Sequence, residues 1–202
     1  MELDAKMKRA QFIENSTEIR EMFSFAHPSQ VLRSVQMYSC HFYGSMLWDL
    51  FGEMTGQVCR TWNTCVKLAW GIPRSSHNYF VDLLAAPLQS VNKKLLCQYV
   101  SFYQRLSKST SREVRIMSNI VSHDIRSVTG RNLTNIACLF NIDPKLHHAE
   151  HFKQKDIGYK IPEEDEWRVP LLRKLLDQRR ELYSCEEDTS NIDELIESLC
   201  SS

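Results

Sequence analysis

The chain has 202 residues, of which 43% are hydrophobic and 25% are charged, and its 25 Lys and Arg balance its 25 Asp and Glu. This composition is typical of a globular protein and excludes collagen-like, fully disordered and membrane-spanning classes. The length suffices for one large domain or two small ones, whose core needs neither disulfides nor a structural metal.

Helical spacing of apolar residues recurs along most of the chain, and the chain has only six Gly and six Pro, the residues that most often interrupt helices. The sequence therefore predicts an all-α fold, an irregular multi-helix bundle. The expected helices span, in chain order, residues 4–26, 29–43, 53–70, 87–107, 110–130, 132–141, 170–182 and 192–199.

Start and stop signals define several of these ends. Pro28 ends the first helix, and Gly71 with Pro73 ends the third, because glycine permits a left-handed residue and proline excludes helix from the residue before it. Thr110 and the carboxylate at Glu113 match a capping box. We expect the helix that begins there to continue to about residue 130.

Buried faces follow from the same spacing. The helix over residues 87–107 has apolar residues around about half of its circumference at 100° per residue, so it should pack on more than one neighbour. The next helix is expected to bury Val114, Met117 and Val121. Tyr38 should lie on the buried face of the second helix.

Charge and polarity divide the chain. Residues 24–155 carry 15 Lys and Arg against 7 Asp and Glu, whereas residues 156–202 carry 6 against 13. Such asymmetry points to a polyanion-binding body with an acidic appendage, although two complementary faces of one domain would give the same counts. We predict a helical body over residues 1–140, a polar linker over 141–168, and C-terminal helices with a mobile acidic tail over 169–202.

The ends of the chain suggest its location and a partner surface. Charges occupy the first six residues, where a secretory signal peptide needs an apolar segment, so we expect an intracellular protein, cytoplasmic or nuclear and not secreted.

The helix over Ile192 to Leu199 needs a partner surface, within the chain or outside it.

Seven scattered cysteines show no Cys-x-x-Cys spacing, so free buried thiols are expected. His147, His148 and His151 could offer imidazoles to zinc, with Cys138 as a fourth ligand, but no carboxylate or thiolate at a suitable spacing completes the set. No metal or cofactor is therefore predicted. Nucleotide-binding glycine loops, serine-nucleophile elbows and zinc-protease motifs are absent from the sequence, so no enzyme is expected.

Basic residues are concentrated in residues 93–131, where eight Lys and Arg face two acidic residues and alternate with Ser and Thr. Long cations neutralise phosphates and short hydroxyls fix their position, so this stretch predicts weak, sequence-independent binding of a nucleic-acid backbone. A solvated helical face would give the same pattern. Trp48, Trp62 and Trp70 are expected in the core rather than stacked on bases. The predicted contact residues are Lys93, Lys94, Arg105, Lys108, Arg112, Arg115, Arg126 and Arg131.

Two tryptophan-containing runs resemble a known family. FYGSMLWDL from Phe42 and WNTCVKLAWGIPR from Trp62 are similar to a stretch that follows the reverse transcriptase palm in polyproteins of non-LTR, LINE-type retrotransposons. Further similarity over residues 8–13, 77–84, 111–133 and the C-terminal end extends the resemblance to nearly all of the chain from Met7 onward.

The resemblance implies a helical thumb and post-thumb segment that contacts the primer and template backbone. The palm with its catalytic aspartates, the fingers and the endonuclease have no counterpart in these residues. The implied protein is a remnant or fragment of an RNA-directed DNA polymerase, without catalytic activity of its own. Two alternatives stay open: a small helical interaction protein derived from the same element, which docks a partner through Ile192 to Leu199, and a truncated product without a role.

Overall fold

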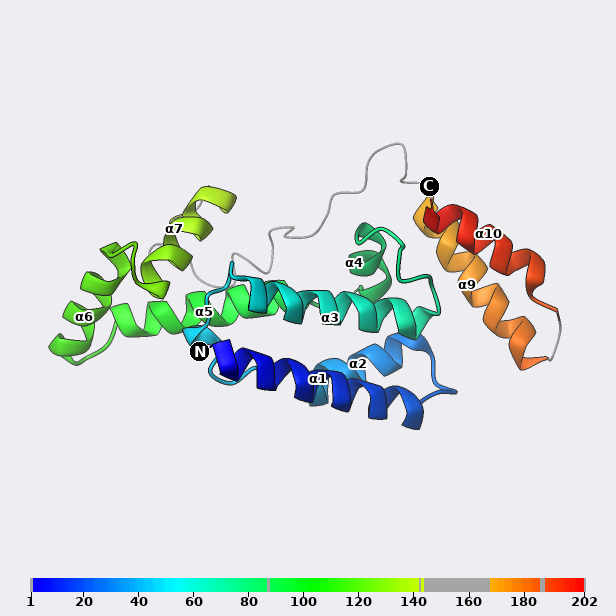
Figure 1. The fold of residues 1–202 in the computed structure, drawn as a ribbon, viewed down its shortest axis with the longest axis horizontal. Helices are drawn as coiled ribbons and strands as arrows, with labels where there is room; N and C mark the ends of the chain where they lie inside the picture. The colour runs from blue at the N-terminus through cyan, green and yellow to red at the C-terminus, as the bar shows by residue number, and fades with distance from the viewer. Residues whose placement is uncertain (1, 87, 142, 144–167, 186–187, 202) are drawn as a thin grey trace. The chain divides into compact units, whose positions relative to one another are not determined.

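The structure, a computed structural model, describes residues 2–86, 88–141, 143, 168–185 and 188–201. Within these ranges every regular element is a helix, which confirms the predicted all-α class (Figure 1). The elements are α1 (Glu2–Met22), α2 (Pro28–Ser39), the short 3-10 helix η1 (Ser45–Leu47), α3 (Glu53–Trp70), α4 (Tyr79–Ala85), α5 (Val91–Ser107), α6 (Arg112–His123), α7 (Val128–Phe140), α9 (Arg168–Ser184) and α10 (Ser190–Ser201).

The predicted third helix coincides with α3, and Gly71, which follows it, has the left-handed φ of 64° that a helix-ending glycine adopts. Other boundaries differ. The second helix ends at Ser39 rather than at residue 43, and Tyr38 is 66% exposed rather than buried. The helix from Arg112 ends at His123, because Asp124 has an extended backbone and Ser127 begins a new helix. The sequence did not predict α4.

Contacts divide the chain into two units, each discontinuous in sequence. Among the described residues, unit 1 comprises 2–14, 39–61, 90–141 and 143, and unit 2 comprises 15–38, 62–86, 88–89, 168–185 and 188–201. The predicted linker falls mostly on residues 144–167, which lie outside the described residues, as do His147, His148 and His151. The boundaries drawn from the sequence therefore stay a prediction.

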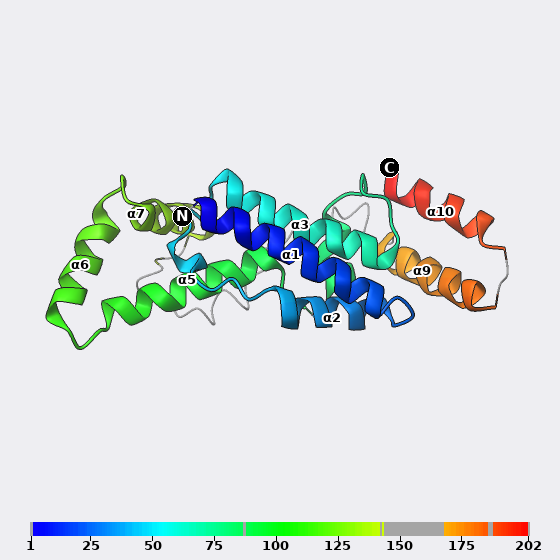
Figure 2. The same cartoon turned by 60° about the horizontal axis from the view of Figure 1, so that its bottom comes forward.

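Unit 1 has an aromatic core beside a chain of packed helices. The Phe12 and Phe42 rings meet edge to face at 5.9 Å, and the Phe42 and Trp48 rings are 6.0 Å apart; such pairs contribute about 0.5–1.5 kcal/mol beyond their buried area. The Trp48 indole N–H donates to the Asp4 carboxylate at 2.8 Å. In sequence order, η1 contacts α5, α5 contacts α6 and α6 contacts α7. The chain changes direction between α5 and α6 and again between α6 and α7 (Figures 1 and 2).

In unit 2, α9 packs against α10 and contacts α4, and Arg179 links α9 to the end of α3. Arg179 of α9 donates to the carbonyls of Trp70 (2.8 Å) and Gly71 (3.1 Å) and pairs with Asp193 of α10 (3.2 Å). A cation at these carbonyls also complements the negative end of the α3 dipole. Arg179 thus joins three helices of this unit.

The last helix finds part of its partner surface within unit 2. In α10, Ile196 is 1% exposed and Cys200 is 2% exposed, and the helix contacts α9. The predicted helix over Ile192 to Leu199 therefore lies within α10. Leu195 stays 53% exposed.

The tryptophans and most cysteines behave as core residues. Trp48, Trp62 and Trp70 are at most 8% exposed, which confirms the core interpretation. Four of the seven free thiols are buried, but those of Cys138 and Cys185 are exposed, so the expectation of buried thiols was wrong for these two. No helix among the described residues is long and apolar enough to cross a membrane.

Candidate nucleic-acid interface

The predicted contact residues all lie in unit 1 but fall into three groups. Lys93 and Lys94 belong to the first turn of α5, and Arg126 and Arg131 flank the start of α7. The other four gather where α5 ends and α6 begins. At 1.5 Å per residue, about 18 Å of helix separates the first group from the second, and α6 puts a similar distance between the second and the third.

The central group, called here the α5–α6 corner, is the densest of the three. It consists of Arg105 in the last turn of α5, Lys108 directly after it, and Arg112 and Arg115 in the first turn of α6. All four residues are exposed. Among the described residues, no hydrogen bond or ion pair engages the side chains of Lys108 and Arg112. Arg105 uses only its Nε, which donates to the Ser101 carbonyl at 3.3 Å.

Arg115 and three short hydroxyl residues build the turn of the corner. One guanidinium nitrogen of Arg115 donates to the carbonyls of Ser109 (2.7 Å) and Thr110 (3.2 Å). The Ser111 hydroxyl caps α6 by accepting from the Val114 N–H at 3.3 Å. The cap therefore lies one residue later than the predicted capping box. Arg115 mainly holds the turn and leaves three cations for a ligand.

One carboxylate lies within the corner. Glu113 accepts a hydrogen bond from the Ser111 hydroxyl at 2.7 Å. This bond, together with a backbone N–H, lowers the pKa of Glu113, so the group is ionised at neutral pH. A carboxylate already complements the positive end of the α6 dipole, where a phosphate would otherwise bind. Phosphates are therefore expected at the long basic side chains, away from the helix N-terminus.

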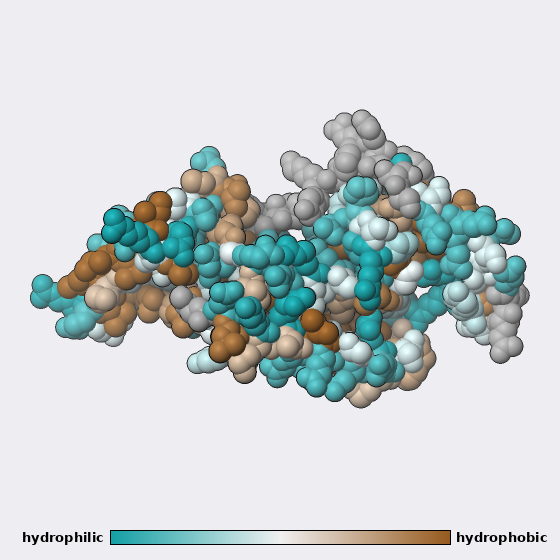
Figure 3. All heavy atoms as spheres, in the orientation of Figure 1, coloured by the Kyte–Doolittle hydropathy of each residue, from teal (hydrophilic) through white to brown (hydrophobic). Residues whose placement is uncertain are grey.

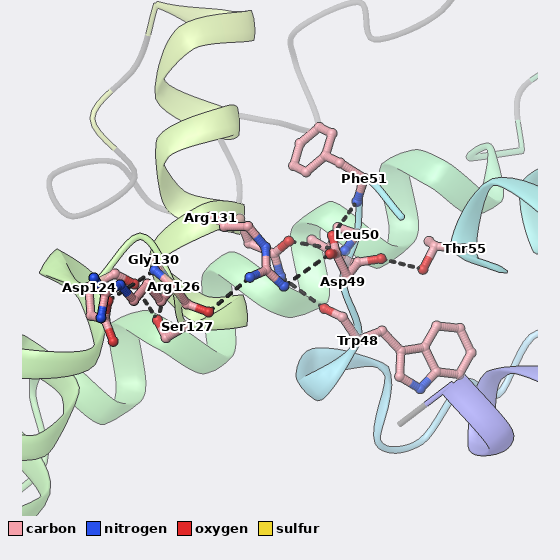
Figure 4. A network of polar contacts seen from close by, with 11 residues as sticks. Trp48, Asp49, Leu50, Phe51, Thr55, Asp124, Arg126, Ser127, Gly130 and Arg131 are labelled. Carbon is pink, nitrogen blue, oxygen red and sulfur yellow. Dashed lines mark hydrogen bonds and ion pairs between the residues drawn. The ribbon is translucent and has the colours of Figure 1, made fainter. Parts of the chain in front are cut away.

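In the third group, Arg126 and Arg131, the Arg131 side chain forms bonds that hold the α6–α7 turn (Figure 4). The Arg131 guanidinium pairs with Asp49 at 3.3 Å and donates to the Arg126 carbonyl at 2.9 Å. Ser127 caps α7 by accepting from the Gly130 N–H at 2.9 Å, and its hydroxyl lies 2.7 Å from the Asp124 carbonyl oxygen. Arg131, whose side chain is 41% exposed, thus stabilises the fold, and Arg126 is the more exposed residue of the two.

Asn132 connects α7 to the segment that follows η1. Its side chain is fully buried; the amide Nδ2 donates to the Trp48 carbonyl at 2.9 Å, and Oδ1 accepts from the Leu50 N–H at 3.0 Å. Both halves of the amide are satisfied by backbone groups 82 and 84 residues away. This pair of bonds positions α7 within unit 1.

Replacing Gly130 with Ala is expected to destabilise unit 1 by about 2 kcal/mol or more, since overpacking typically costs about 1–3 kcal/mol. A Cβ at Gly130 would lie 2.2 Å from the carbonyl oxygen of Asp124, and backbone cannot move aside as a flexible side chain can. Urea unfolding followed by circular dichroism measures the loss. Gly56→Ala is the control, because the nearest atom to its Cβ is a side-chain nitrogen of Arg60 at 3.5 Å. Equal stability of the two variants would contradict the close approach.

Two surface hollows do not add to the interface. One, of about 430 Å³ in unit 1, has Glu2, Asp49 and Glu53 in its lining, and these carboxylates repel a polyanion. The other, of about 440 Å³ in unit 2, includes Arg179 and Arg180, whose guanidinium groups donate to backbone carbonyls. No cluster of metal-ligating side chains occurs in the part of the chain that the structure describes.

Sequence reasoning assigned the wrong face of α6 to the core. Of the three residues expected to be buried, Val114 and Met117 are 36% and 59% exposed and Val121 is half-buried, whereas Ser118 and Ser122 are only 8% exposed. The serines face the chain because their small side chains let α6 approach α5 and α7 closely. Their spacing of four residues was the available signal, but periodicity does not tell which face of a helix is packed.

Comparisons of the chain with protein-family models, curated proteins and solved structures gave no match. The exposed cations of the α5–α6 corner therefore carry the functional conclusion.

Proposed function

We propose that the α5–α6 corner binds the phosphate backbone of a nucleic acid, weakly and without sequence preference, and that the chain acts by binding rather than by catalysis. The supporting observation is that Arg105, Lys108 and Arg112 are exposed around one turn, and that the charged groups of the last two engage no described residue. Cations of this kind neutralise phosphates and release counterions, which supplies sequence-independent affinity.

Phosphate contact fits the corner better than base reading. Sequence is read by side chains that a helix or ribbon presents to the base edges in a groove. The corner is a turn between two helices, and its cations are long and flexible. Lys108 and Arg112 are placed to follow a backbone rather than to select a base.

The resemblance to non-LTR retrotransposon polyproteins supports the same class of ligand, because the region after the palm in that family contacts the primer and template. On this proposal the chain is the non-catalytic, template-gripping part of an RNA-directed DNA polymerase, present as a remnant or fragment. Its activity alone would be nucleic-acid affinity.

Fluorescence anisotropy of a labelled duplex, titrated with the full chain at several salt concentrations, tests the proposal. If three phosphates are neutralised, the logarithm of the affinity should fall against the logarithm of salt with a slope of about −3. Changing Arg105, Lys108 and Arg112 together to Gln should bring that slope close to zero. Glu113→Gln should tighten binding at low salt, because it removes the carboxylate from the corner.

A control variant separates the corner from net charge. Lys6, Arg33 and Lys174 are exposed and lie on other helices, and changing all three to Gln alters the formal charge by the same amount. This control should keep the wild-type slope. An unchanged slope in the corner variant, or an equal loss in the control, would show that the corner is an ordinary solvated surface.

A further inference from the structure

One side of α5 carries a row of polar side chains that the core of unit 1 does not use. Residues three and four positions apart lie on the same side of an α-helix, and these five fall within about 80° of arc. Each is exposed or half-buried, and the last directly follows the helix at the α5–α6 corner. The row, called here the α5 row, consists of Lys94, Gln98, Ser101, Arg105 and Lys108.

The α5 row is long enough to hold several phosphates of one strand. At 1.5 Å per residue, about 21 Å separates Lys94 from Lys108, and a hydrogen-bond donor recurs about every 5 Å between them. Among the described residues, no hydrogen bond engages the Lys94 ammonium, the Gln98 amide nitrogen or the Ser101 hydroxyl. The row therefore has cations at both ends and free neutral donors between them, which suits a phosphate backbone that lies along the helix.

The other helix of the corner, α6, does not offer the backbone a comparable path. Ile116, Met117 and Ile120 are 47%, 59% and 58% exposed, and Figure 3 shows hydrophobic residues gathered over α6, at the left of the view. A phosphate pressed against apolar surface loses water without gaining a partner, which is costly. A strand bound at the corner is therefore expected to continue along α5.

An exposed aromatic ring lies beside the middle of the α5 row. Tyr43 is 85% exposed and stands two residues before Ser45, whose hydroxyl donates to Gln98 Oε1 at 3.1 Å. The 3-10 helix that Ser45 begins contacts α5. Because consecutive Cα atoms are 3.8 Å apart, the Cα atom of Tyr43 lies within about 7.6 Å of that of Ser45. The ring can therefore reach a base of a strand that lies on the row.

A carboxylate near Tyr43 favours a base over a phosphate at this ring. Asp4 lies beside Gly44, the neighbour of Tyr43: its Oδ2 would be 3.7 Å from a Cβ at Gly44. This negative charge repels phosphates but not the uncharged face of a base. The bases of a duplex are stacked on one another, whereas those of a single strand are free to stack on an aromatic side chain. A basic track beside an aromatic ring is the combination that holds single strands without reading their sequence.

We infer that the α5 row and Tyr43 bind single-stranded nucleic acid in preference to a duplex. The sugar–phosphate strand lies along α5 from the corner to Lys94, and one base stacks on Tyr43. The inference rests on the proposed function, because the corner forms one end of the row. Lys93 lies about 100° around α5 from Lys94 and is not part of the row.

Fluorescence anisotropy of the full chain with a labelled oligothymidylate of about 15 nucleotides, and with a duplex of the same length, is the test. The single strand should bind about fivefold or more tightly than the duplex. Tyr43→Ala should remove this advantage, and Tyr43→Phe should keep it. An abasic strand of equal length has the phosphates without the bases, so Tyr43→Ala should bind it as the wild type does. Tyr38→Ala is the control, since Tyr38 is 66% exposed on α2.

A second pair of variants tests the path of the strand. Lys94→Gln should reduce the salt slope for the single strand by about 0.7, the value of one phosphate contact, and the adjacent Lys93→Gln should leave it unchanged. Circular dichroism verifies that each variant is folded. Equal affinity for strand and duplex, equal losses in Tyr38→Ala and Tyr43→Ala, or equal effects of the two lysines would overturn the inference. Duplex binding that still depends on the corner cations would then leave the proposed function standing.

Discussion

Replacing Asn132 with Leu is expected to lower the free energy of unfolding by about 3 kcal/mol or more, since each buried polar group left without a partner costs about 1–3 kcal/mol. Leucine has nearly the same shape as asparagine but can neither donate to the Trp48 carbonyl nor accept from the Leu50 N–H. Both backbone groups would then be unsatisfied inside unit 1, because Asn132 itself is fully buried. The loss should be specific to this position.

Urea unfolding of the wild type and two variants measures this effect. Asn135→Leu is the control: it makes the same chemical change one helical turn away in α7, at a half-buried position. Its effect should stay within about 0.5 kcal/mol, as for most substitutions away from a buried network. If Asn132→Leu unfolds at the same urea concentration as this control, the two bonds of the amide do not hold α7.

Replacing Lys67 with Met is expected to lower the free energy of unfolding by about 2 kcal/mol at neutral pH, since two backbone carbonyls, one of them at a buried residue, lose a charged donor. Lys67 is 5% exposed, and its Nζ donates to the carbonyls of Arg74 (3.0 Å) and Ser76 in the turn after α3. Removing the buried charge offsets part of this loss. Lys174→Met, at an exposed position of α9, is the control and should leave stability unchanged.

The pH dependence of stability also reports on Lys67. Burial is the main cause that lowers its pKa in the folded chain below the usual 10.5, so the unfolded chain binds the proton more tightly. Stability from this group should therefore increase as pH rises through the interval between the folded pKa and 10.5. The free energy of unfolding of the wild type, minus that of Lys67→Met, should therefore increase over that pH interval. The nearby Cys200 thiol titrates in both proteins; burial raises its pKa, and the Lys67 charge lowers it in the wild type alone. A constant difference would contradict the shift.

The limits of α3 could be predicted because local chemistry determines them. Val58, Trp62 and Val66 recur at four-residue spacing and are all buried. The helix ends where Gly71 adopts a backbone conformation that other residues rarely take. Neither feature depends on distant parts of the chain.

The end of α6 could not be predicted in the same way. Gly130 resembles a helix-ending glycine in the sequence, but the structure places it in the first turn of α7, after the Ser127 cap. It is required there because the Asp124 carbonyl lies against it. This close approach depends on how α6 and α7 meet, which no local pattern encodes.

The candidate site could likewise be predicted only where its residues are close in sequence. Arg105, Lys108 and Arg112 lie within eight residues of one another, so any tight turn brings them together. Lys93 is separated from them by the length of α5. No local pattern indicated that Arg131 pairs with Asp49, because Asp49 lies 82 residues earlier in the chain.

The central claim is that the α5–α6 corner is the surface that contacts a phosphate backbone, and heteronuclear NMR tests it most directly. Isotope-labelled chain would be titrated with a short duplex while the resonances of arginine Nε and of backbone amides are followed. Shifts should be largest at Arg105, Lys108 and Arg112, smaller at the first turn of α5, and should disappear at high salt. Shifts of equal size spread over both units, or confined to residues outside the corner, would contradict the account.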